Sequence, residues 1–516
     1  MRWYWRVAMA ALGGLSSYFA YPSPALWPLI FLTVPVMLAS IRGAKFWGAV
    51  GLGVIAGFCF YAAQITWISQ YLGPRPLLIL AGGQGLLMGL FLGIIAVVWR
   101  RLDARLTGPW RHIVPPFAVA CIWMLRDWIS SNYPYGGFPW ARLAISQSNS
   151  PLAKWVYFGG MGLLTLIIVI TSVLILESIR SWRAGKRGWQ MSHGAIAVAI
   201  LFAVPMITVV PTNAENGYLT VGGAQGNGKA GLFAVHARGE IIKNHIEATR
   251  RLLTKPDTPQ LDLLVWPENG ADLSPLNEAD ANVMMTNLVN GEVKAPLIFG
   301  TLWQRGDNIY NSSIMWEPGK GATDWYDKKV LVPFGEYLPD RAFWYPVAPD
   351  LVDLIRGHWT PGTREGIFEV KGKPVGTVIC FEVSMDDNWR DLIAEKAEVV
   401  LAQTNNADFG HSDEAYQQLA IARLRAIESG RSVVNVSTVG PSAIFAPDGS
   451  ELAAIKAFTR DGLWAKVPLR TSITPAMVIG PLTDRAYNLF ALVFILFGGL
   501  DWLRSIRRRR AQRRNA

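Results

Sequence analysis

The stretch Val378-Ile379-Cys380-Phe381-Glu382 predicts a short buried strand that ends on a cysteine and is followed by a carboxylate. Two other apolar stretches carry a polar side chain at their edge: Glu268 follows Val265-Trp266-Pro267, and Lys328 precedes Val330-Leu331-Val332. A thiol, a carboxylate and an amine are the groups that an acyl-transfer site needs. These stretches therefore predict an α/β fold with its functional side chains at strand ends.

The composition indicates that much of the chain lies in a membrane. The chain has 516 residues, which is too many for one ordinary domain. Hydrophobic residues make up 51% of it and charged residues only 17%, whereas soluble proteins carry roughly 25% charged residues. The 22 tryptophans fit the aromatic belts that form at membrane interfaces.

Eight apolar runs have about the length of a membrane-spanning helix. They cover about 7–21, 24–41, 46–68, 76–99, 112–130, 156–179, 192–211 and 487–503. Basic residues gather in alternate gaps and in the C-terminal tail, so the positive-inside rule places both termini in the cytoplasm. The first run has the charge pattern of a signal peptide, but the next apolar run follows so closely that we favour a span.

These runs divide the chain into four parts. We expect a membrane domain at 1–211 with seven transmembrane helices, an extracytoplasmic domain at 212–486, an eighth transmembrane helix at 487–503 and a basic cytoplasmic tail at 504–516. The extracytoplasmic part alternates short apolar strands with amphipathic helices, which predicts an α/β sandwich. Expected strands are 217–224, 261–266, 296–302, 309–316, 374–381, 397–404, 432–438, 442–447 and 462–467, and expected helices are 236–254, 276–290, 386–395 and 413–429.

Several classes of function are disfavoured. The net charge of +11 comes with no aromatic or glycine-rich recognition pattern, so the basic tail indicates contact with anionic lipid rather than nucleic acid. Cys59 and Cys121 lie in apolar runs, which leaves Cys380 as the only thiol of the polar part and no disulfide framework. The six histidines lack paired ligand spacing, so we expect no metal and no cofactor.

The three polar residues have plain roles in acyl transfer. A thiolate at Cys380 attacks a carbonyl, a carboxylate at Glu268 takes the thiol proton, and a lysine ammonium stabilises the oxyanion. Taken singly, each residue has an ordinary alternative: an inert buried thiol, a solvated loop carboxylate, an exposed face for Lys328 and Lys329, and a surface turn for Glu336.

The motifs around these residues identify a family. The polar part resembles the nitrilase superfamily, an α-β-β-α sandwich, and nearly the whole chain resembles the apolipoprotein N-acyltransferase family. The motifs are Ala224-Gln225-Gly226-Asn227, Trp266-Pro267-Glu268-Asn269, Tyr310-Asn311-Ser312, Lys328 with Leu331 to Tyr337, Ile379-Cys380-Phe381-Glu382, Arg425 to Arg431, and Phe138-Pro139-Trp140.

The resemblance implies a set of site residues and a reaction. The family's triad falls on Glu268, Lys328 and Cys380, and Lys328 rather than Lys329 matches because it stands eight residues before Glu336. The supporting residues fall on Glu336, Glu382, Asn311 and Phe381. The implied reaction is ping-pong: Cys380 takes an acyl chain from a membrane phospholipid as a thioester and passes it to the α-amino group of a diacylglyceryl-apolipoprotein. The implied enzyme is a monomer in the plasma membrane.

Two apolar segments are candidates for lipid contact. The segment from Tyr337 to Pro361 is too apolar for an ordinary exposed loop, so we interpret it as an arm or lid, with a loop packed on its own domain as the alternative. Its candidate contacts are Phe343, Trp344, Tyr345 and Trp359. Trp140 is a further candidate, although an interfacial anchor is the favoured interpretation of its motif.

The chain departs from the family at three places. Asn405-Asn406-Ala407-Asp408 stands where the family usually has Asn-Asp-Ala-Trp, Thr438 to Ser442 replaces an Asn-Asn-Gly-like stretch, and 231–235 lacks an expected tryptophan. These departures resemble the actinobacterial branch. They leave open a paralogue with altered or reduced activity. A separate alternative is a membrane-anchored amidohydrolase, in which water resolves the thioester, but the many spans and the apolar arm disfavour it.

Overall fold

A computed structural model describes residues 2–183, 185, 189–231, 234, 236–354 and 358–514. The expected arm residue Ile355 and the departure residues Leu232, Phe233 and Val235 lie outside the described residues. The chain forms two compact units. A helical unit contains Met1–Ser69, Gly73–Val209 and Val478–Ala516, and an α/β unit contains Gln70–Leu72 and Val210–Met477.

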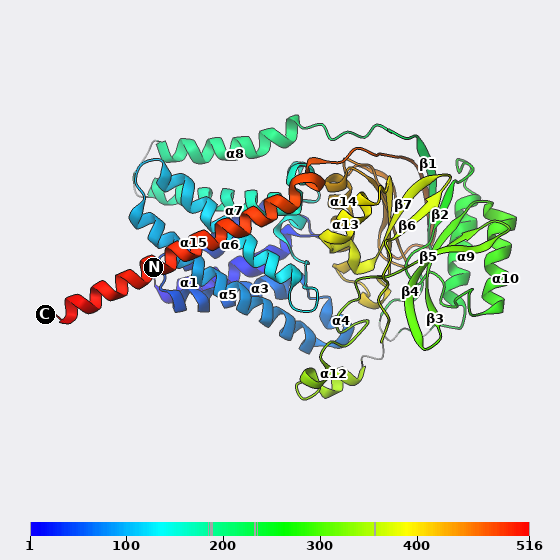
Figure 1. Ribbon diagram of the computed structural model, residues 1–516, viewed down its shortest axis with the longest axis horizontal. Helices are drawn as coiled ribbons and strands as arrows, with labels where there is room; N and C mark the ends of the chain where they lie inside the picture. Colours follow the sequence, from blue (N-terminus) through cyan, green and yellow to red (C-terminus); the bar gives the residue numbers. More distant parts are fainter. Residues whose placement is uncertain are drawn as a thin grey trace. The chain divides into compact units, whose positions relative to one another are not determined.

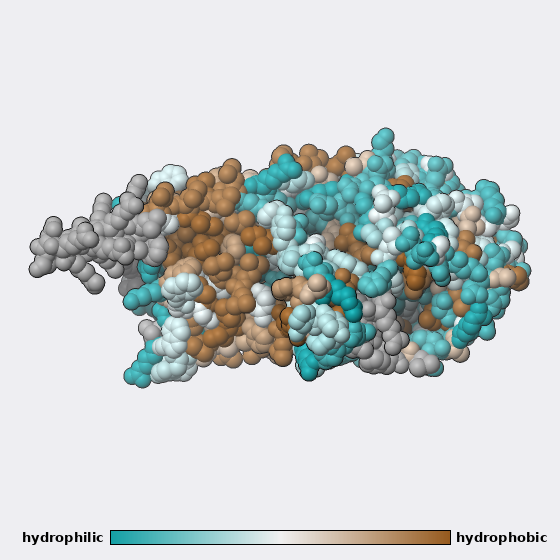
Figure 2. All heavy atoms as spheres, turned by 60° about the horizontal axis from the view of Figure 1, so that its bottom comes forward, coloured by the Kyte–Doolittle hydropathy of each residue, from teal (hydrophilic) through white to brown (hydrophobic). Residues whose placement is uncertain are grey.

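Long apolar helices make up the helical unit (Figure 1). They are α1 (Trp3–Ser16), α2 (Ile30–Ile41), α3 (Phe46–Gln64), α5 (Pro74–Arg105), α6 (Trp110–Asn132), α7 (Val156–Arg183), α8 (Trp189–Ile207) and α15 (Pro475–Arg514), with the short α4 at Ile68–Leu72. Short 3-10 turns lie at Ser17–Ala20, Trp27–Leu29, Leu143–Gln147 and Pro151–Trp155. Figure 2 shows an apolar surface gathered over this unit.

Five of the described helices are long and apolar enough to cross a membrane. They are Phe46–Gln64, Pro74–Arg105, Trp110–Asn132, Pro151–Arg183 and Pro475–Asp501, and shorter apolar helices lie at Trp27–Ile41 and Val198–Ile207. The 14 residues of α1 extend about 21 Å, less than the hydrocarbon core of roughly 30 Å. The eight-span count therefore stays a prediction.

Glycines let α3 and α5 approach closely. Gly53 and Gly57 on α3 meet Gly85 and Gly89 on α5, each pair four residues apart. A Cβ on Gly53 would lie 2.8 Å from the Cα of Gly89, and a Cβ on Gly57 would lie 3.0 Å from the Cα of Gly85. Such small-residue pairs are typical of tight helix packing in membranes.

The C-terminal helix begins earlier than the sequence analysis expects. The expected span starts at residue 487, but α15 starts at Pro475 and the α/β unit ends at Met477. Asp484 and Arg485 interrupt the apolar run without interrupting the helical backbone, since charged side chains do not break a helix. Proline is favoured at a helix's first position, where its missing N–H costs nothing.

The α/β unit contains two six-stranded sheets. The strands are β1 (Tyr218–Gln225), β2 (Leu263–Val265), β3 (Leu297–Arg305), β4 (Asn308–Glu317), β5 (Gly321–Asp327), β6 (Ile367–Val370), β7 (Lys373–Ile379), β8 (Val399–Thr404), β9 (Ser432–Ser437), β10 (Ser442–Phe445), β11 (Glu451–Ile455) and β12 (Asp461–Pro468). Their orders are β12-β1-β2-β3-β4-β5 and β11-β10-β9-β8-β7-β6. In each sheet three strands run parallel, β1, β2 and β3 in one and β7, β8 and β9 in the other.

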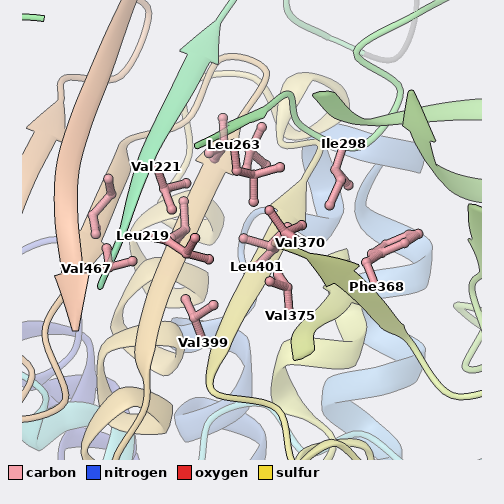
Figure 3. Close-up of a cluster of buried hydrophobic side chains, with 14 of the residues drawn as sticks. Leu219, Val221, Leu263, Ile298, Phe368, Val370, Val375, Val399, Leu401 and Val467 are labelled. Atoms are coloured by element: carbon pink, nitrogen blue, oxygen red, sulfur yellow. The ribbon is translucent and has the colours of Figure 1, made fainter. Parts of the chain in front are cut away.

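The sheets and helices stack in four layers. Side chains such as Val221, Leu263, Val375 and Leu401 point toward one another between the two sheets (Figure 3). A second cluster lies between the first sheet and its helices, so Leu264 on β2 faces away from its neighbours Leu263 and Val265. The helices are α9 (Glu240–Leu253) and α10 (Ala279–Asn287) on the first sheet, α13 (Asp386–Ala394) and α14 (Glu414–Ser429) on the second, and the short α11 (Arg341–Trp344) and α12 (Pro349–Leu354).

All nine expected strands are present, and β5, β6 and β11 were missed. All three are edge strands. In β5 and β11 most residues are exposed or half-buried, and β6 has only four residues. Central parallel strands are buried on both faces and have continuous apolar sequences, whereas an exposed edge strand lacks that signal. The missed β5 matters for function, because it leads into Lys328.

Candidate functional site

Three strands bring the candidate residues to the site. Glu268 follows β2, Lys328 follows β5 and Cys380 follows β7. Cys380 has a φ of +53°, a left-handed conformation that is uncommon for residues other than glycine. It begins a 3-10 turn at Cys380–Ser384. Glu268 and Lys328 have 4% and 1% of their surface exposed, so the charged groups of the site are almost completely buried.

Glu382 fixes the turn that carries the thiol. One of its oxygens, Oε2, accepts a hydrogen bond from the Ile379 N–H at 2.8 Å. The other, Oε1, accepts from the N–H groups of Lys329 and Val330 at 2.8 and 3.0 Å and from the Tyr326 hydroxyl at 2.8 Å. Burial raises the pKa of this carboxyl, although its backbone donors favour the charged form. Glu382 thereby joins the Cys380 turn to the Lys328 segment.

Lys328 lies between two carboxylates. Its Nζ is 2.6 Å from Glu336 Oε1 and 3.5 Å from Glu268 Oε1. The amide nitrogen of Asn311 donates to the same two oxygens, at 2.7 Å to Glu268 and 3.3 Å to Glu336. Glu336 is held in turn by the Val332 N–H, which donates to its Oε2 at 2.7 Å. One ammonium and one amide therefore hold two carboxylates in a dry environment, where such a hydrogen-bonded network favours ordered geometry.

The pKa values follow from this burial and charge. Burial lowers the pKa of Lys328, but Glu336 and Glu268 outweigh burial, so its net pKa is raised and it stays an ammonium. Burial raises the pKa of Glu268, and Lys328 opposes that rise. Burial and the Glu268 charge raise the pKa of the Cys380 thiol well above its ordinary value. The resting site therefore holds a protonated thiol.

Glu268 is the carboxylate whose charge acts most strongly on that thiol. The Cys380 thiol in turn opposes the rise that burial causes in the pKa of Glu268. Glu268 Oε1 is occupied by Asn311, but Oε2 is buried and has no hydrogen-bond partner among the described residues. A buried acceptor without a donor is costly, and a raised pKa suits a general base that works near neutral pH.

The two adjacent lysines point to different surroundings. Lys329 Nζ pairs with Glu365 at 2.6 Å and Asp391 at 3.5 Å, and its side chain is 23% exposed. The fully buried Lys328 side chain is the one that meets Glu268. The geometry therefore brings together Glu268, Lys328, Asn311 and Glu336 as the resemblance implies, and it leaves Lys329 outside. Their catalytic roles stay predictions.

Comparison with known proteins places the chain in a family. It is 32% identical to the apolipoprotein N-acyltransferase of Mycolicibacterium smegmatis, over 97% of this chain and 86% of that protein. This chain belongs to the apolipoprotein N-acyltransferase family. The enzyme of that name from Pseudomonas syringae pv. tomato is 28% identical, over 96% of this chain and 98% of that protein.

Family models agree with this membership of the apolipoprotein N-acyltransferase family. The apolipoprotein N-acyltransferase N-terminal domain matches residues 13–174, and carbon-nitrogen hydrolase matches residues 240–474. The α/β unit is thus a nitrilase-like domain. A solved amidase from Nesterenkonia is matched with a TM-score of 0.36 and 14% identity, over 50% of this chain and 94% of that chain.

The candidate lipid contacts of this acyltransferase differ in exposure. Phe343 and Tyr345 have 65% and 43% of their surface exposed. Trp344 packs edge-on against Phe334, with ring centroids 5.2 Å apart. The Trp359 N–H donates to the Glu336 carbonyl at 3.2 Å, so the arm returns to the site.

Trp140 and Phe381 are buried. Trp140 is only 3% exposed and packs against Trp67 in the helical unit, with ring centroids 5.7 Å apart. Phe381 is 8% exposed beside the thiol. Lipid contact by Trp140 and the arm stays a prediction.

One residue that touches the thiol was missed by sequence reasoning. Gln418 Nε2 on α14 lies 3.6 Å from Cys380 Sγ and donates to it. The departure at Asn406 was the available signal, because the amide of Asn406 binds Gln418 at 2.7 Å. Within the described ranges, no group of three or more His, Cys, Asp or Glu side chains is arranged to hold a metal ion.

Proposed function

We propose that this chain transfers an acyl chain from a membrane phospholipid, through a thioester on Cys380, to the α-amino group of the N-terminal diacylglyceryl-cysteine of an apolipoprotein. The observation that carries the proposal is the cluster of the buried Glu268 and Lys328 with the half-buried Cys380 in a member of the apolipoprotein N-acyltransferase family. This reaction is the final step of lipoprotein maturation.

In the first half-reaction Cys380 attacks the ester carbonyl of the phospholipid. Glu268 takes the thiol proton, the S–C bond forms, and the carbonyl oxygen becomes an oxyanion. The Lys328 ammonium stabilises that oxyanion, which is worth most in a dry site. Glu268 then returns the proton to the departing glycerol oxygen, which releases lysophospholipid and leaves the thioester.

In the second half-reaction an amine attacks the thioester. The amine needs acceptors for its N–H groups, and Glu268 Oε2 and Asn311 Oδ1 are buried oxygens without hydrogen-bond partners among the described residues. Glu268 takes one amine proton, the N–C bond forms, and the C–S bond breaks. The same proton restores the Cys380 thiol, so the enzyme emerges unchanged.

The membrane placement belongs to the same proposal. A helical domain at about 1–211 and a C-terminal span hold the nitrilase-like domain outside the cytoplasm, with both termini inside and the enzyme acting as a monomer. The apolar candidate spans and the exposed aromatic residues Phe343 and Tyr345 support an enzyme whose donor and acceptor are both lipids in the bilayer.

The test is a labelled acyl chain. Purified protein is incubated with a labelled phospholipid and a diacylated lipopeptide, and we compare wild type with Cys380→Ser and with the matched control Cys59→Ala. We expect label on the lipopeptide amine for wild type and Cys59→Ala, and none for Cys380→Ser. Release of labelled free fatty acid alone would establish the amidohydrolase alternative suggested by the carbon-nitrogen hydrolase match. Absence of a hydroxylamine-sensitive label on the wild-type protein would overturn both.

A further inference from the structure

A directional chain of hydrogen bonds runs behind Cys380. The Gly440 N–H donates to Ser437 Oγ at 2.9 Å, so that oxygen acts as an acceptor there. The Ser437 hydroxyl then donates to Asn406 Oδ1 at 2.5 Å. Because Oδ1 of Asn406 is an acceptor in this contact, the amide nitrogen of Asn406 faces the opposite way.

The amide nitrogen of Asn406 makes two bonds. It donates to Gln418 Oε1 and to Glu414 Oε2, both at 2.7 Å. With its oxygen engaged, Gln418 presents its own Nε2–H to Cys380 Sγ at 3.6 Å. Asn406, Glu414 and Gln418 have 3%, 2% and 1% of their surface exposed, so water does not compete for these groups.

We propose that Gln418 is a catalytic residue that donates a hydrogen bond to the Cys380 sulfur, and that Asn406 and Glu414 are positioning residues that hold its amide in that orientation. This assignment rests on the proposed function for its place in the reaction. The donor acts whenever negative charge develops on sulfur: as the proton leaves for Glu268 before attack, and as the C–S bond breaks and its electron pair returns to sulfur. The amide keeps its proton throughout.

Glu414 accepts from Asn406 without adding charge at neutral pH. Burial, followed by interactions with Glu268 and Asp408, raises the pKa of Glu414 to about 8. A protonated carboxyl still accepts the Asn406 N–H through its carbonyl oxygen. A charged Glu414 would make the thiol harder to ionise, as Glu268 and Glu336 already do.

The departure from the family motif has a physical meaning here. Asn406 stands where the resemblance expects an aspartate, and an ionised aspartate has no N–H to give to Gln418 or Glu414. Asparagine supplies both bonds and leaves the site without another carboxylate. The departure thus fits a site that uses an amide, rather than a charge, against the sulfur.

The test measures the reactivity of the thiol itself, which does not depend on the acyl donor. Full-length detergent-solubilised protein is alkylated with iodoacetamide from neutral to alkaline pH, and modification of the Cys380 peptide is followed by mass spectrometry. The groups that face the sulfur in this titration are Glu268, Lys328, Glu414 and Glu336. For Gln418→Met, which keeps the length but removes the donor, we expect about 10-fold slower alkylation at neutral pH and a profile moved to higher pH.

Three further variants separate positioning from other effects. Asn406→Leu leaves Gln418 in place without adding charge, and we expect a similar slowing. Glu414→Gln keeps a neutral acceptor for Asn406 but cannot ionise, so we expect faster alkylation than wild type above about pH 8, where the wild-type carboxylate opposes thiol ionisation. Asn435→Ala removes a buried amide on β9 whose nitrogen donates to the Pro441 carbonyl at 3.4 Å; it should lower the thermal midpoint and leave the alkylation rate unchanged.

Several results would overturn the assignment. A wild-type rate for Gln418→Met would remove the donor role. Slow alkylation of Gln418→Met with a wild-type rate for Asn406→Leu would attribute the loss to blocked access, and slow alkylation of Asn435→Ala would attribute it to general loosening. If the alkylation series behaves as expected but no acyl chain reaches the lipopeptide, the proposed function fails and Gln418 keeps its role at the thiol.

Discussion

Two carboxylates act on Cys380 or its turn, Glu268 and Glu382, and they differ in how many hydrogen bonds their oxygens accept. Glu382 accepts four hydrogen bonds, three of them from backbone N–H groups, and both its oxygens are occupied. Glu268 has one oxygen bound to Asn311 and the other without a partner among the described residues. A fully bonded carboxylate holds structure in place, whereas a buried acceptor left open is available for chemistry. The comparison predicts that a substitution at Glu268 mainly lowers activity, whereas a substitution at Glu382 mainly lowers stability.

The largest expected effect comes from Glu268→Gln. The amide oxygen can still accept from Asn311, so the fold should survive, but the base is gone. We expect formation of the acyl-enzyme to fall by about 10²–10⁴-fold with little change in the thermal midpoint. Intact-protein mass spectrometry after exposure to phospholipid measures the acyl-enzyme. Ordinary acylation of this variant would remove Glu268 from the base role.

A smaller loss of rate, with a larger loss of stability, is expected from Lys328→Met. The loss of oxyanion stabilisation should slow acylation by about 10²–10³-fold. It also leaves Glu268 and Glu336 buried without their cation, so the free energy of unfolding should drop by about 3 kcal/mol or more. Lys329→Met is the matched control, because its side chain pairs outside the site. Equal effects of the two substitutions would contradict the buried pairing.

Glu382→Gln should lower stability more than acylation, the opposite of what we expect for Glu268→Gln. Its amide group brings N–H donors toward backbone N–H groups, which breaks part of the bonding that holds the turn. We expect unfolding to become easier by roughly 1–3 kcal/mol, with acylation reduced less than in Glu268→Gln. Thermal unfolding in detergent and the acyl-enzyme assay report the two effects side by side. A variant of unchanged stability and no activity would place Glu382 in the chemistry instead.

The smallest effect concerns the pH dependence of stability at Glu414. Burial raises its pKa from 4.5 to about 8 in the fold, so between these values the native state holds a proton that the unfolded state has released. Stability therefore falls as pH rises through this window. Glu414→Gln removes that contribution, so its thermal midpoint should decline less than that of wild type between pH 4.5 and 8. Parallel pH profiles would contradict a buried, protonated Glu414.

The sequence predicted the central strands of the two sheets better than the edge strands. Strands such as β2 and β8 are buried on both faces, and their apolar runs predict them from the sequence. The edge strand β5 has no such run, because most of its side chains are exposed or half-buried. The apolar sequence of the eighth span begins at 487, whereas α15 begins at Pro475, because Asp484 and Arg485 interrupt the apolar run but not the helix.

Some residues of the candidate site were likewise predictable from the sequence and others were not. Cys380 and Glu268 stand at the ends of recognisable strands, and family motifs separate Lys328 from Lys329. Gln418 was missed, because one glutamine on an amphipathic helix looks like many others and its signal was indirect, through the departure at Asn406. Its importance depends on a side-chain orientation, fixed by Asn406 from a different element, that periodicity does not reveal.

The bonding of Glu382 has a mechanical consequence. Lys329 and Val330 follow β5 of one sheet, whereas Ile379 ends β7 of the other, so one carboxylate ties the two sheets together beside the reacting groups. This short tie constrains the spacing of amine and thiol together with Gln403 on β8, whose Nε2 donates to the Trp266 carbonyl at 2.7 Å. Substitutions of one aliphatic side chain for another in the apolar core can then lower stability while the distance between the thiol and the ammonium is preserved.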